Sequence, residues 1–69
     1  MINIIRIERA TRKMTQQQLA DAVQVSRQTI NAIESGKYIP STILSMKISE
    51  IFEKNVNEIF QLEDKDWSE

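Results

Sequence analysis

The chain has 69 residues, of which 41% are hydrophobic and 28% charged, so it can form one small globular domain and is too apolar for a disordered tail. It contains no cysteine and no histidine, which removes disulfides, thiol nucleophiles, imidazole bases and the usual zinc ligands. We therefore expect a protein that is not an enzyme and holds no metal or cofactor. No uninterrupted apolar run exceeds two residues, so we expect no membrane span or signal peptide and a cytoplasmic location.

The small size of the chain favours association with a second copy, and its charge distribution favours an anionic partner. A domain this small buries only about 60% of the surface of its unfolded chain, so a second copy would supplement a marginal core. Residues 1–40 carry six basic and three acidic side chains, a net charge of +3, whereas residues 41–69 carry three basic and seven acidic ones, a net charge of −4. An anionic partner would thus meet the first half of the chain, although such charges are also compatible with simple solvated surface.

The N-terminal segment has the spacing of an amphipathic helix that ends near Lys13. Its apolar residues recur every three to four positions, and we expect the following on the buried face: Ile4, Ile7, Ala10 or Thr11, and Met14. The basic residues fall largely off that face: Arg6, Arg9, Arg12 and Lys13.

Two short helices should follow, separated by a tight turn at residues 24–26. Thr15 and Gln18 have the spacing of a capping box, which predicts a second helix that ends near Val23 and buries Leu19, Ala20 and Val23. Ser26 can cap a third helix, which would bury Ile30 and Ile33 and stop at Gly36.

The second half of the chain predicts two further helices. Ser41 can cap a fourth helix, whose inner face would consist of Leu44, Ile48, Ile51 and Phe52. Asn55 and Glu58 repeat the capping-box spacing and would begin a single-turn fifth helix that presents Val56, Ile59 and Phe60. Ile59 and Phe60 suit either the core of the monomer or a dimer seam. The next segment, Gln61 to Glu63, is compatible with a short extended stretch beside Ile2 and Asn3.

The second and third predicted helices have the arrangement that places side chains in the major groove of DNA. Burial of Ile30 and Ile33 leaves Arg27, Gln28, Asn31 and Ala32 on or near the opposite face of the third helix. Arginine can donate a bidentate pair to guanine, glutamine and asparagine can do the same to adenine, and alanine can touch a thymine methyl group.

The segment MTQQQLADAVQVSRQTINAIESGKYIPS resembles the helix-turn-helix of the Xre family, of the Cro and phage-repressor type. RIERATRK resembles the first helix of that family, and FEKNVNEIF resembles its junction between the fourth and fifth helices. The resemblance implies an all-α fold of the lambda-repressor-like type, a compact five-helix bundle over residues 1–69, with a short extended segment at the termini as an option. Within it, the helix-turn-helix would span residues 15–35, the recognition helix residues 27–35 and an acidic tail residues 61–69. It further implies a homodimer that binds a pseudo-palindromic operator in double-stranded DNA and represses transcription.

The DNA contacts of the family carry over to matching positions. Gln16 would touch a backbone phosphate and brace the recognition helix, and Arg27 and Gln28 would read bases. The remaining matches are Ala32 as a third base-reading position, Ser26, Ser35 and Lys37 as phosphate contacts, and Thr29 and Asn31 as secondary candidates. Tyr38 suits either a phosphate contact or packing beside Pro40.

The resemblance also implies a largely buried ion pair between Arg9 and Glu34, so we do not expect Glu34 to contact DNA. The sequence departs from the family pattern at Gln24, where glycine in a left-handed conformation is common. Three further residues stand where many relatives have small, apolar or glycine residues: Glu8, Glu53 and Lys54. We expect these departures to affect local turn geometry.

Two alternatives remain open. The same fold can serve as a protein-interaction or antitoxin-like module, which the acidic second half would suit, although the predicted recognition face favours DNA. The basic side chains of Arg6, Arg12 and Lys13 are equally consistent with phosphate contacts and with solubility.

Overall fold

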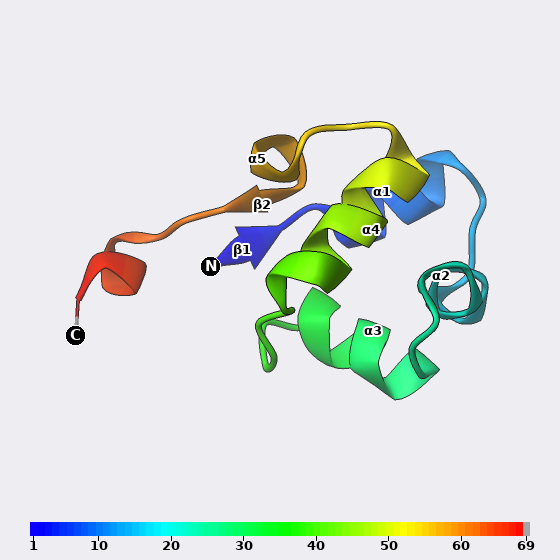
Figure 1. Cartoon of the computed structure of the whole chain (residues 1–69), viewed down its shortest axis with the longest axis horizontal. Coiled ribbons are helices and arrows are strands. Elements are labelled where there is room, and N and C mark those ends of the chain that lie inside the picture. The colour runs from blue at the N-terminus through cyan, green and yellow to red at the C-terminus, as the bar shows by residue number, and fades with distance from the viewer. Residues whose placement is uncertain (69) are drawn as a thin grey trace.

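Five short α-helices make up most of the computed structural model, which describes residues 1–68 (Figure 1). They are α1 (Ile5–Thr11), α2 (Gln16–Val23), α3 (Arg27–Glu34), α4 (Thr42–Phe52) and α5 (Val56–Ile59). Strands β1 (Ile2–Asn3) and β2 (Phe60–Gln61) pair antiparallel, with Ile2 opposite Gln61 and Asn3 opposite Phe60. A short 3-10 helix, η1 (Asp64–Trp67), follows. The prediction of an all-α fold with an extended segment at the termini is confirmed, except that the C-terminal strand begins one residue earlier, at Phe60. Glu69, the last residue of the predicted acidic tail, lies outside the described residues.

The predicted helix starts are confirmed by their capping hydrogen bonds. The backbone N–H of Thr15 donates to Gln18 Oε1 at 2.8 Å, and the N–H of Gln18 donates to Thr15 Oγ1 at 3.0 Å. The hydroxyl oxygens of Ser26 and Ser41 accept from the N–H groups of Thr29 and Leu44 at 3.2 and 3.1 Å. Each cap satisfies a donor that the first turn of a helix would otherwise leave unpaired.

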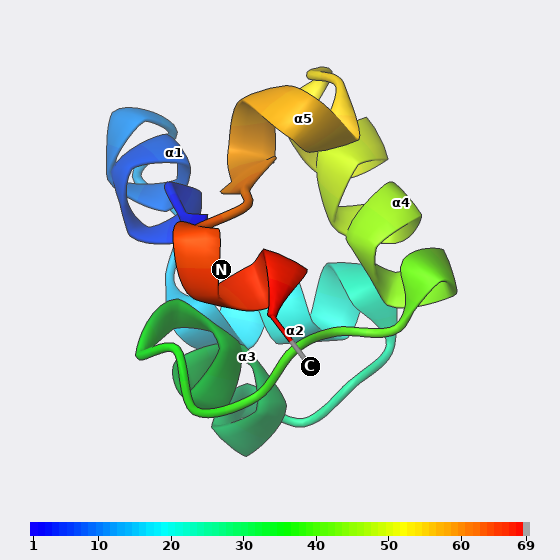
Figure 2. The ribbon, with the colours of Figure 1, turned by 90° about the vertical axis from the view of Figure 1, so that its left-hand side faces the viewer.

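The core lies between the helices, which surround it in the view along the long axis (Figure 2). Its buried residues are Leu19, Ala20, Val23, Ile30, Ile33, Leu44, Ile48, Phe52, Ile59 and Phe60, all of them predicted, together with Ile5 from α1. Ile51 and Val56, also predicted on inner faces, are half-buried and pack against this core, and Phe60 lies in β2 instead of the fifth helix. Ile59 and Phe60 are buried within one copy of the chain, so they belong to the core of the monomer. The N–H of Ile4 donates to the carbonyl of Ile59 at 3.0 Å, which extends the contact between the two ends of the chain.

The predicted buried face of the first helix is wrong in part. Ile7 is 62% exposed and Ala10 is also exposed, whereas the side chain of Glu8 is only 7% exposed. Glu8 is tolerated there because Arg12 Nη1 lies 2.7 Å and Lys54 Nζ 3.2 Å from its carboxylate oxygens. The hydrogen bond from Arg12 outweighs desolvation and, with that from Lys54, holds the pKa of Glu8 below its ordinary value.

Arg12 also turns inward, against the prediction that the basic residues of this helix point away from its buried face. Its Nη2 donates to the carbonyl oxygen of Phe52 at 2.6 Å, and its guanidinium carbon lies 5.0 Å from the centre of the Phe52 ring. Arg12 therefore ties the end of α1 to the end of α4. The departures from the family pattern at Glu8 and Lys54 thus form one compensating interaction, because the two side chains pair with each other.

Among residues 1–68, three residues other than glycine take the left-handed conformation: Lys13, Gln24 and Glu53, with φ values of 53°, 64° and 55°. Gln24 closes α2 and Glu53 closes α4. Gly36, with φ of 79°, follows the last turn of α3 as predicted. The turn between α2 and α3 thus keeps the left-handed backbone without the glycine that favours it. No helix among residues 1–68 is long and apolar enough to cross a membrane.

Replacing Gln24 with glycine is expected to raise the free energy of unfolding by about 1 kcal/mol, because glycine has no Cβ to strain the left-handed backbone. The side chain is exposed, and its one hydrogen bond within the described part of the chain is accepted from Lys47 at 3.2 Å, so little is lost with it. Urea denaturation of Gln24→Gly and of Gln24→Ala separates the backbone effect from the loss of the side chain. If the alanine variant gained as much stability as the glycine variant, backbone strain would not be the cause.

Candidate nucleic-acid interface

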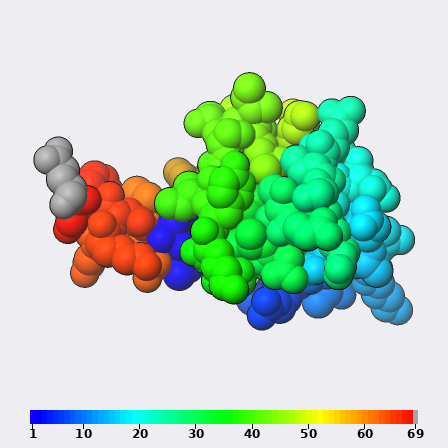
Figure 3. All heavy atoms as spheres, turned by 90° about the horizontal axis from the view of Figure 1, so that it is seen from below, coloured from blue at the N-terminus to red at the C-terminus, as the bar shows by residue number. Residues whose placement is uncertain are grey.

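Helices α2 and α3 pack against each other and present α3 on one face of the molecule (Figure 3). The N–H of Val25 donates to the carbonyl of Ala20 at 3.0 Å, which closes the turn between them. Ile30 and Ile33 bury the inner side of α3. The outer side of α3 is therefore free to meet a ligand.

The residues predicted to contact DNA lie along this face. Arg27, Gln28 and Asn31 are exposed, and Ala32 and Thr29 are half-buried. Ser26 stands at the start of the helix and Ser35 and Lys37 at its end, all three exposed. The arrangement brings two amides, a guanidinium and an ammonium group to one surface, which is a set of donors suited to phosphates and base edges.

Some of these polar groups already have partners within the chain. Ser26 Oγ lies 3.0 Å from Thr29 Oγ1 in addition to accepting from the Thr29 N–H. Ser35 Oγ donates to the carbonyl of Ala32 at 3.2 Å. These contacts hold the two ends of α3 and leave the hydroxyl groups at its surface.

The predicted ion pair between Arg9 and Glu34 is confirmed. Arg9 Nε lies 2.6 Å from Glu34 Oε2, and Arg9 Nη2 donates to Glu34 Oε1 at 2.9 Å, so the pair is bidentate. The side chain of Glu34 is 1% exposed and that of Arg9 is 14% exposed. Arg9 Nη1 also donates to the carbonyl of Met14 at 2.8 Å. The pair thus ties the end of α3 to α1 and to the segment before α2, and Glu34 is not presented to a ligand.

Burial and hydrogen bonding act on Glu34 in opposite directions. Desolvation raises the pKa of its carboxyl, but the hydrogen bonds from Arg9 and Gln16 outweigh it, so the pKa lies below its ordinary value of 4.5. Glu34 is therefore ionised at neutral pH and supplies the negative charge around which the neighbouring donors assemble.

Gln16 lies at the first position of α2 and is half-buried. Its Nε2 donates to Glu34 Oε1 at 3.3 Å, so it contacts the last residue of α3. The bracing contact expected of Gln16 is present in this form, with Glu34 as its partner. Glu34 is 18 residues further along the chain, so local sequence patterns do not indicate this partner.

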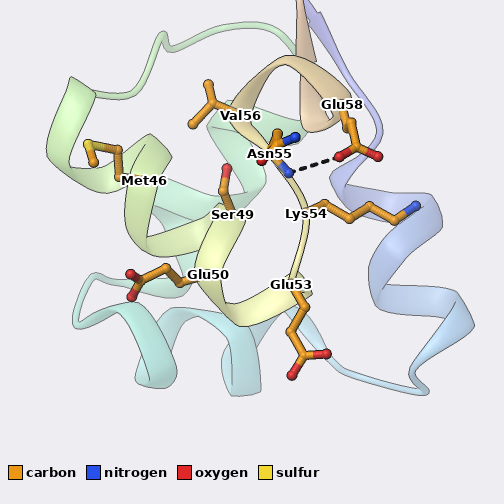
Figure 4. Close-up of a pocket in the computed structure, with 8 residues that line it drawn as sticks. All are labelled: Met46, Ser49, Glu50, Glu53, Lys54, Asn55, Val56 and Glu58. Carbon is orange, nitrogen blue, oxygen red and sulfur yellow. Dashed lines mark hydrogen bonds between the residues drawn. The ribbon is translucent and has the colours of Figure 1, made fainter.

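The opposite side of the molecule is acidic. A hollow of about 570 Å³ between α4 and α5 is lined by three glutamates, Glu50, Glu53 and Glu58, and by Lys54 (Figure 4). Glu58 accepts a hydrogen bond from the N–H of Asn55 at 3.1 Å and so caps α5. In Figure 1 the end of α4 that leads into α5 lies across the molecule from α3. Three acidic residues of the second half of the chain thus lie on this side, whereas Glu63 and Asp66 line a second hollow together with Ser35 and Gly36 at the end of α3.

The comparisons with known proteins agree with one another. A family model described as helix-turn-helix matches residues 5–59. An uncharacterised HTH-type transcriptional regulator of Methanocaldococcus jannaschii is 47% identical over 64 residues, which cover 93% of this chain and 97% of that protein. The uncharacterised HTH-type regulator YgzD of Bacillus subtilis is 38% identical over 65 residues, 94% of this chain and 98% of that protein. A third, from Archaeoglobus fulgidus, is 42% identical over 62 residues and covers 90% and 89% of the two chains.

Proposed function

The chain belongs to the helix-turn-helix family of transcriptional regulators, and on that basis we propose that it is a homodimeric repressor that binds a pseudo-palindromic operator in double-stranded DNA. Membership of the family implies DNA-binding regulation of transcription. The observation that supports the finer proposal is the outer face of α3. There Arg27, Gln28 and Asn31 are exposed, and within residues 1–68 their side chains form no hydrogen bonds.

In this proposal α3 enters the major groove. The guanidinium of Arg27 donates a bidentate pair to a guanine, Gln28 pairs with an adenine and Ala32 contacts a thymine methyl group. The phosphate contacts come from Gln16, Ser26, Ser35 and Lys37, with Thr29 and Asn31 beside them. The recognition helix is residues 27–35 within a helix-turn-helix of residues 15–35, and the acidic side of the domain points away from the DNA.

The dimer follows from the size of the domain and from the geometry of DNA. Two recognition helices reach successive major grooves when they are about 34 Å apart, and an operator with two-fold symmetry matches a symmetric pair of chains. A second copy also adds to a small core. The protein acts by occupying a promoter and carries out no catalysis.

The test is selection of bound sites from a pool of random duplexes, followed by the same selection with Arg27→Ala. We expect the native chain to enrich an inverted repeat and Arg27→Ala to lose about 1–3 kcal/mol of binding free energy, with relaxed specificity at one base pair of each half-site.

Arg27→Lys is the matched control, because it keeps the positive charge but not the bidentate fork. It should relax specificity in the same way while it retains more of the affinity. If Arg27→Ala selected the same operator with unchanged affinity, the assignment of Arg27 would be wrong.

The alternative is a protein-interaction or antitoxin-like module, which the acidic hollow between α4 and α5 favours. Under this alternative, the selection would enrich no sequence, and DNA binding would be weak and salt-sensitive.

A further inference from the structure

We propose that Arg6 binds a phosphate of the DNA backbone together with Gln16, so that the phosphate-binding surface extends from α2 onto α1. The inference rests on the proposed function, because it concerns the same DNA. It assigns a phosphate contact to Arg6 but not to Arg12, although the sequence alone does not distinguish the two arginines.

Two donors from different helices lie close to Glu34 Oε1. Gln16 Nε2 lies 3.3 Å from this oxygen and Arg6 Nε lies 3.5 Å from it. The two nitrogen atoms are consequently no more than 6.8 Å apart. One phosphate group that accepts a hydrogen bond from each side chain can span such a separation, since charge-assisted hydrogen bonds to phosphate measure about 2.7–2.9 Å.

The charge balance leaves Arg6 available. Glu34 is already neutralised by the bidentate pair with Arg9, at 2.6 and 2.9 Å, so the longer contact with Arg6 adds a second cation to one carboxylate. The Arg6 side chain is 72% exposed, whereas that of Glu34 is 1% exposed. The cluster of two arginines and one glutamate thus carries one net positive charge, which lies at the surface on Arg6.

The position of α1 places this charge at the edge of the proposed DNA-binding face. Figure 3 looks at the side crossed by α3, and atoms of α1, in blue, border it along one edge. Arg6 contacts Glu34, the last residue of α3, and Gln16, which contacts the same carboxylate oxygen, is the first residue of α2. Arg12 is different, because its guanidinium is held by Glu8 and by the carbonyl and ring of Phe52.

The experiment measures affinity for a selected operator duplex as a function of salt, between about 0.05 and 0.2 M. Each phosphate neutralised contributes about 0.9 to the slope of log affinity against log salt. For Arg6→Gln we expect the slope to shrink by about 0.9 for each bound copy, with affinity about fivefold weaker per copy at about 0.15 M salt and the selected sequence unchanged. Arg6→Lys should keep most of the slope.

Lys65→Gln is the matched control, because it removes one positive charge from a side chain in η1 that is 74% exposed and lies 3.7 Å from the carboxylate of Glu63, which balances its charge. Its slope should equal that of the native chain. The inference is overturned if Arg6→Gln changes the slope no more than Lys65→Gln does, while Arg27→Ala still relaxes specificity. If the native chain itself selects no operator, the proposed function fails, and the inference fails with it.

Discussion

Replacing Arg9 with alanine is expected to lower the free energy of unfolding by about 3–5 kcal/mol, because it leaves the Glu34 carboxylate buried without its main partner. Arg9 supplies the two shortest contacts to Glu34, at 2.6 and 2.9 Å, whereas Gln16 and Arg6 approach no closer than 3.3 and 3.5 Å. A domain of this length has a total stability of roughly 3–10 kcal/mol. The variant should therefore be mostly or entirely unfolded at 25 °C, as circular dichroism in a urea titration would show.

A double variant, Arg9→Met with Glu34→Leu, is the control for this explanation. It removes both charges and fills their volume with apolar atoms, and such exchanges are often neutral in stability or stabilising. We expect the double variant to be folded and close to the native chain in stability. If it were as unstable as Arg9→Ala, shape at this position rather than an uncompensated charge would be responsible.

The same pair makes stability depend on pH. Because the pKa of Glu34 is lower in the folded chain than its ordinary value of 4.5, the stabilisation is complete above about pH 4.5 and is lost as the pH falls through the folded-state pKa. Glu34→Gln should reduce the slope of unfolding free energy against pH in this acid range. An unchanged slope would assign the acid sensitivity to the other carboxylates with lowered pKa values, Glu8, Glu63 and Asp66.

Helix starts could be predicted because their determinants are local. Thr15, Ser26 and Ser41 each accept a hydrogen bond from a backbone N–H three residues further on, so both partners can be read in one short segment. The buried stripes of α2, α3 and α4 are likewise set by periodicity within each helix. Arg9 and Glu34 are 25 residues apart in the sequence, so their ion pair could be predicted only from the resemblance to a family.

The buried face of α1 could not be predicted, because local spacing does not distinguish its two candidate stripes. Ile4 and Ile7 fit one stripe, and Ile5 and Glu8 fit the other. Hydrophobicity favours the first, but the second is buried, and the charge of Glu8 is compensated by Arg12 and by Lys54, which lies 46 residues away in the sequence. The same long-range contacts divide the arginines: Arg12 pairs with the end of α4, and Arg6 stays at the surface near α3. The candidate DNA-binding residues on α3 were predictable as a surface, whereas the contribution of α1 required the tertiary structure.

Replacing Phe52 with alanine is expected to lower the free energy of unfolding by about 3–5 kcal/mol, because it opens a cavity where the largest fully buried side chain of the core now lies. Phe52 is completely buried at the end of α4, and its ring also lies under the guanidinium of Arg12 at 5.0 Å. The substitution therefore removes packing and a cation–π contact together. Thermal and urea unfolding would measure the loss.

Two further variants separate these contributions. Phe52→Leu keeps much of the volume but not the ring, so it should lower the free energy of unfolding less than Phe52→Ala does. The difference in stability between these two variants should shrink when Arg12 is also replaced, and a double-mutant cycle measures that change.

Ile7→Ala removes an apolar side chain that is 62% exposed, so it should change the free energy of unfolding by no more than about 0.5 kcal/mol. If Ile7→Ala instead cost as much as Phe52→Ala, α1 would bury the stripe that its hydrophobic spacing favours. Glu8, Arg12 and Lys54 would then be surface residues, and Arg12 would become as available to a phosphate as Arg6.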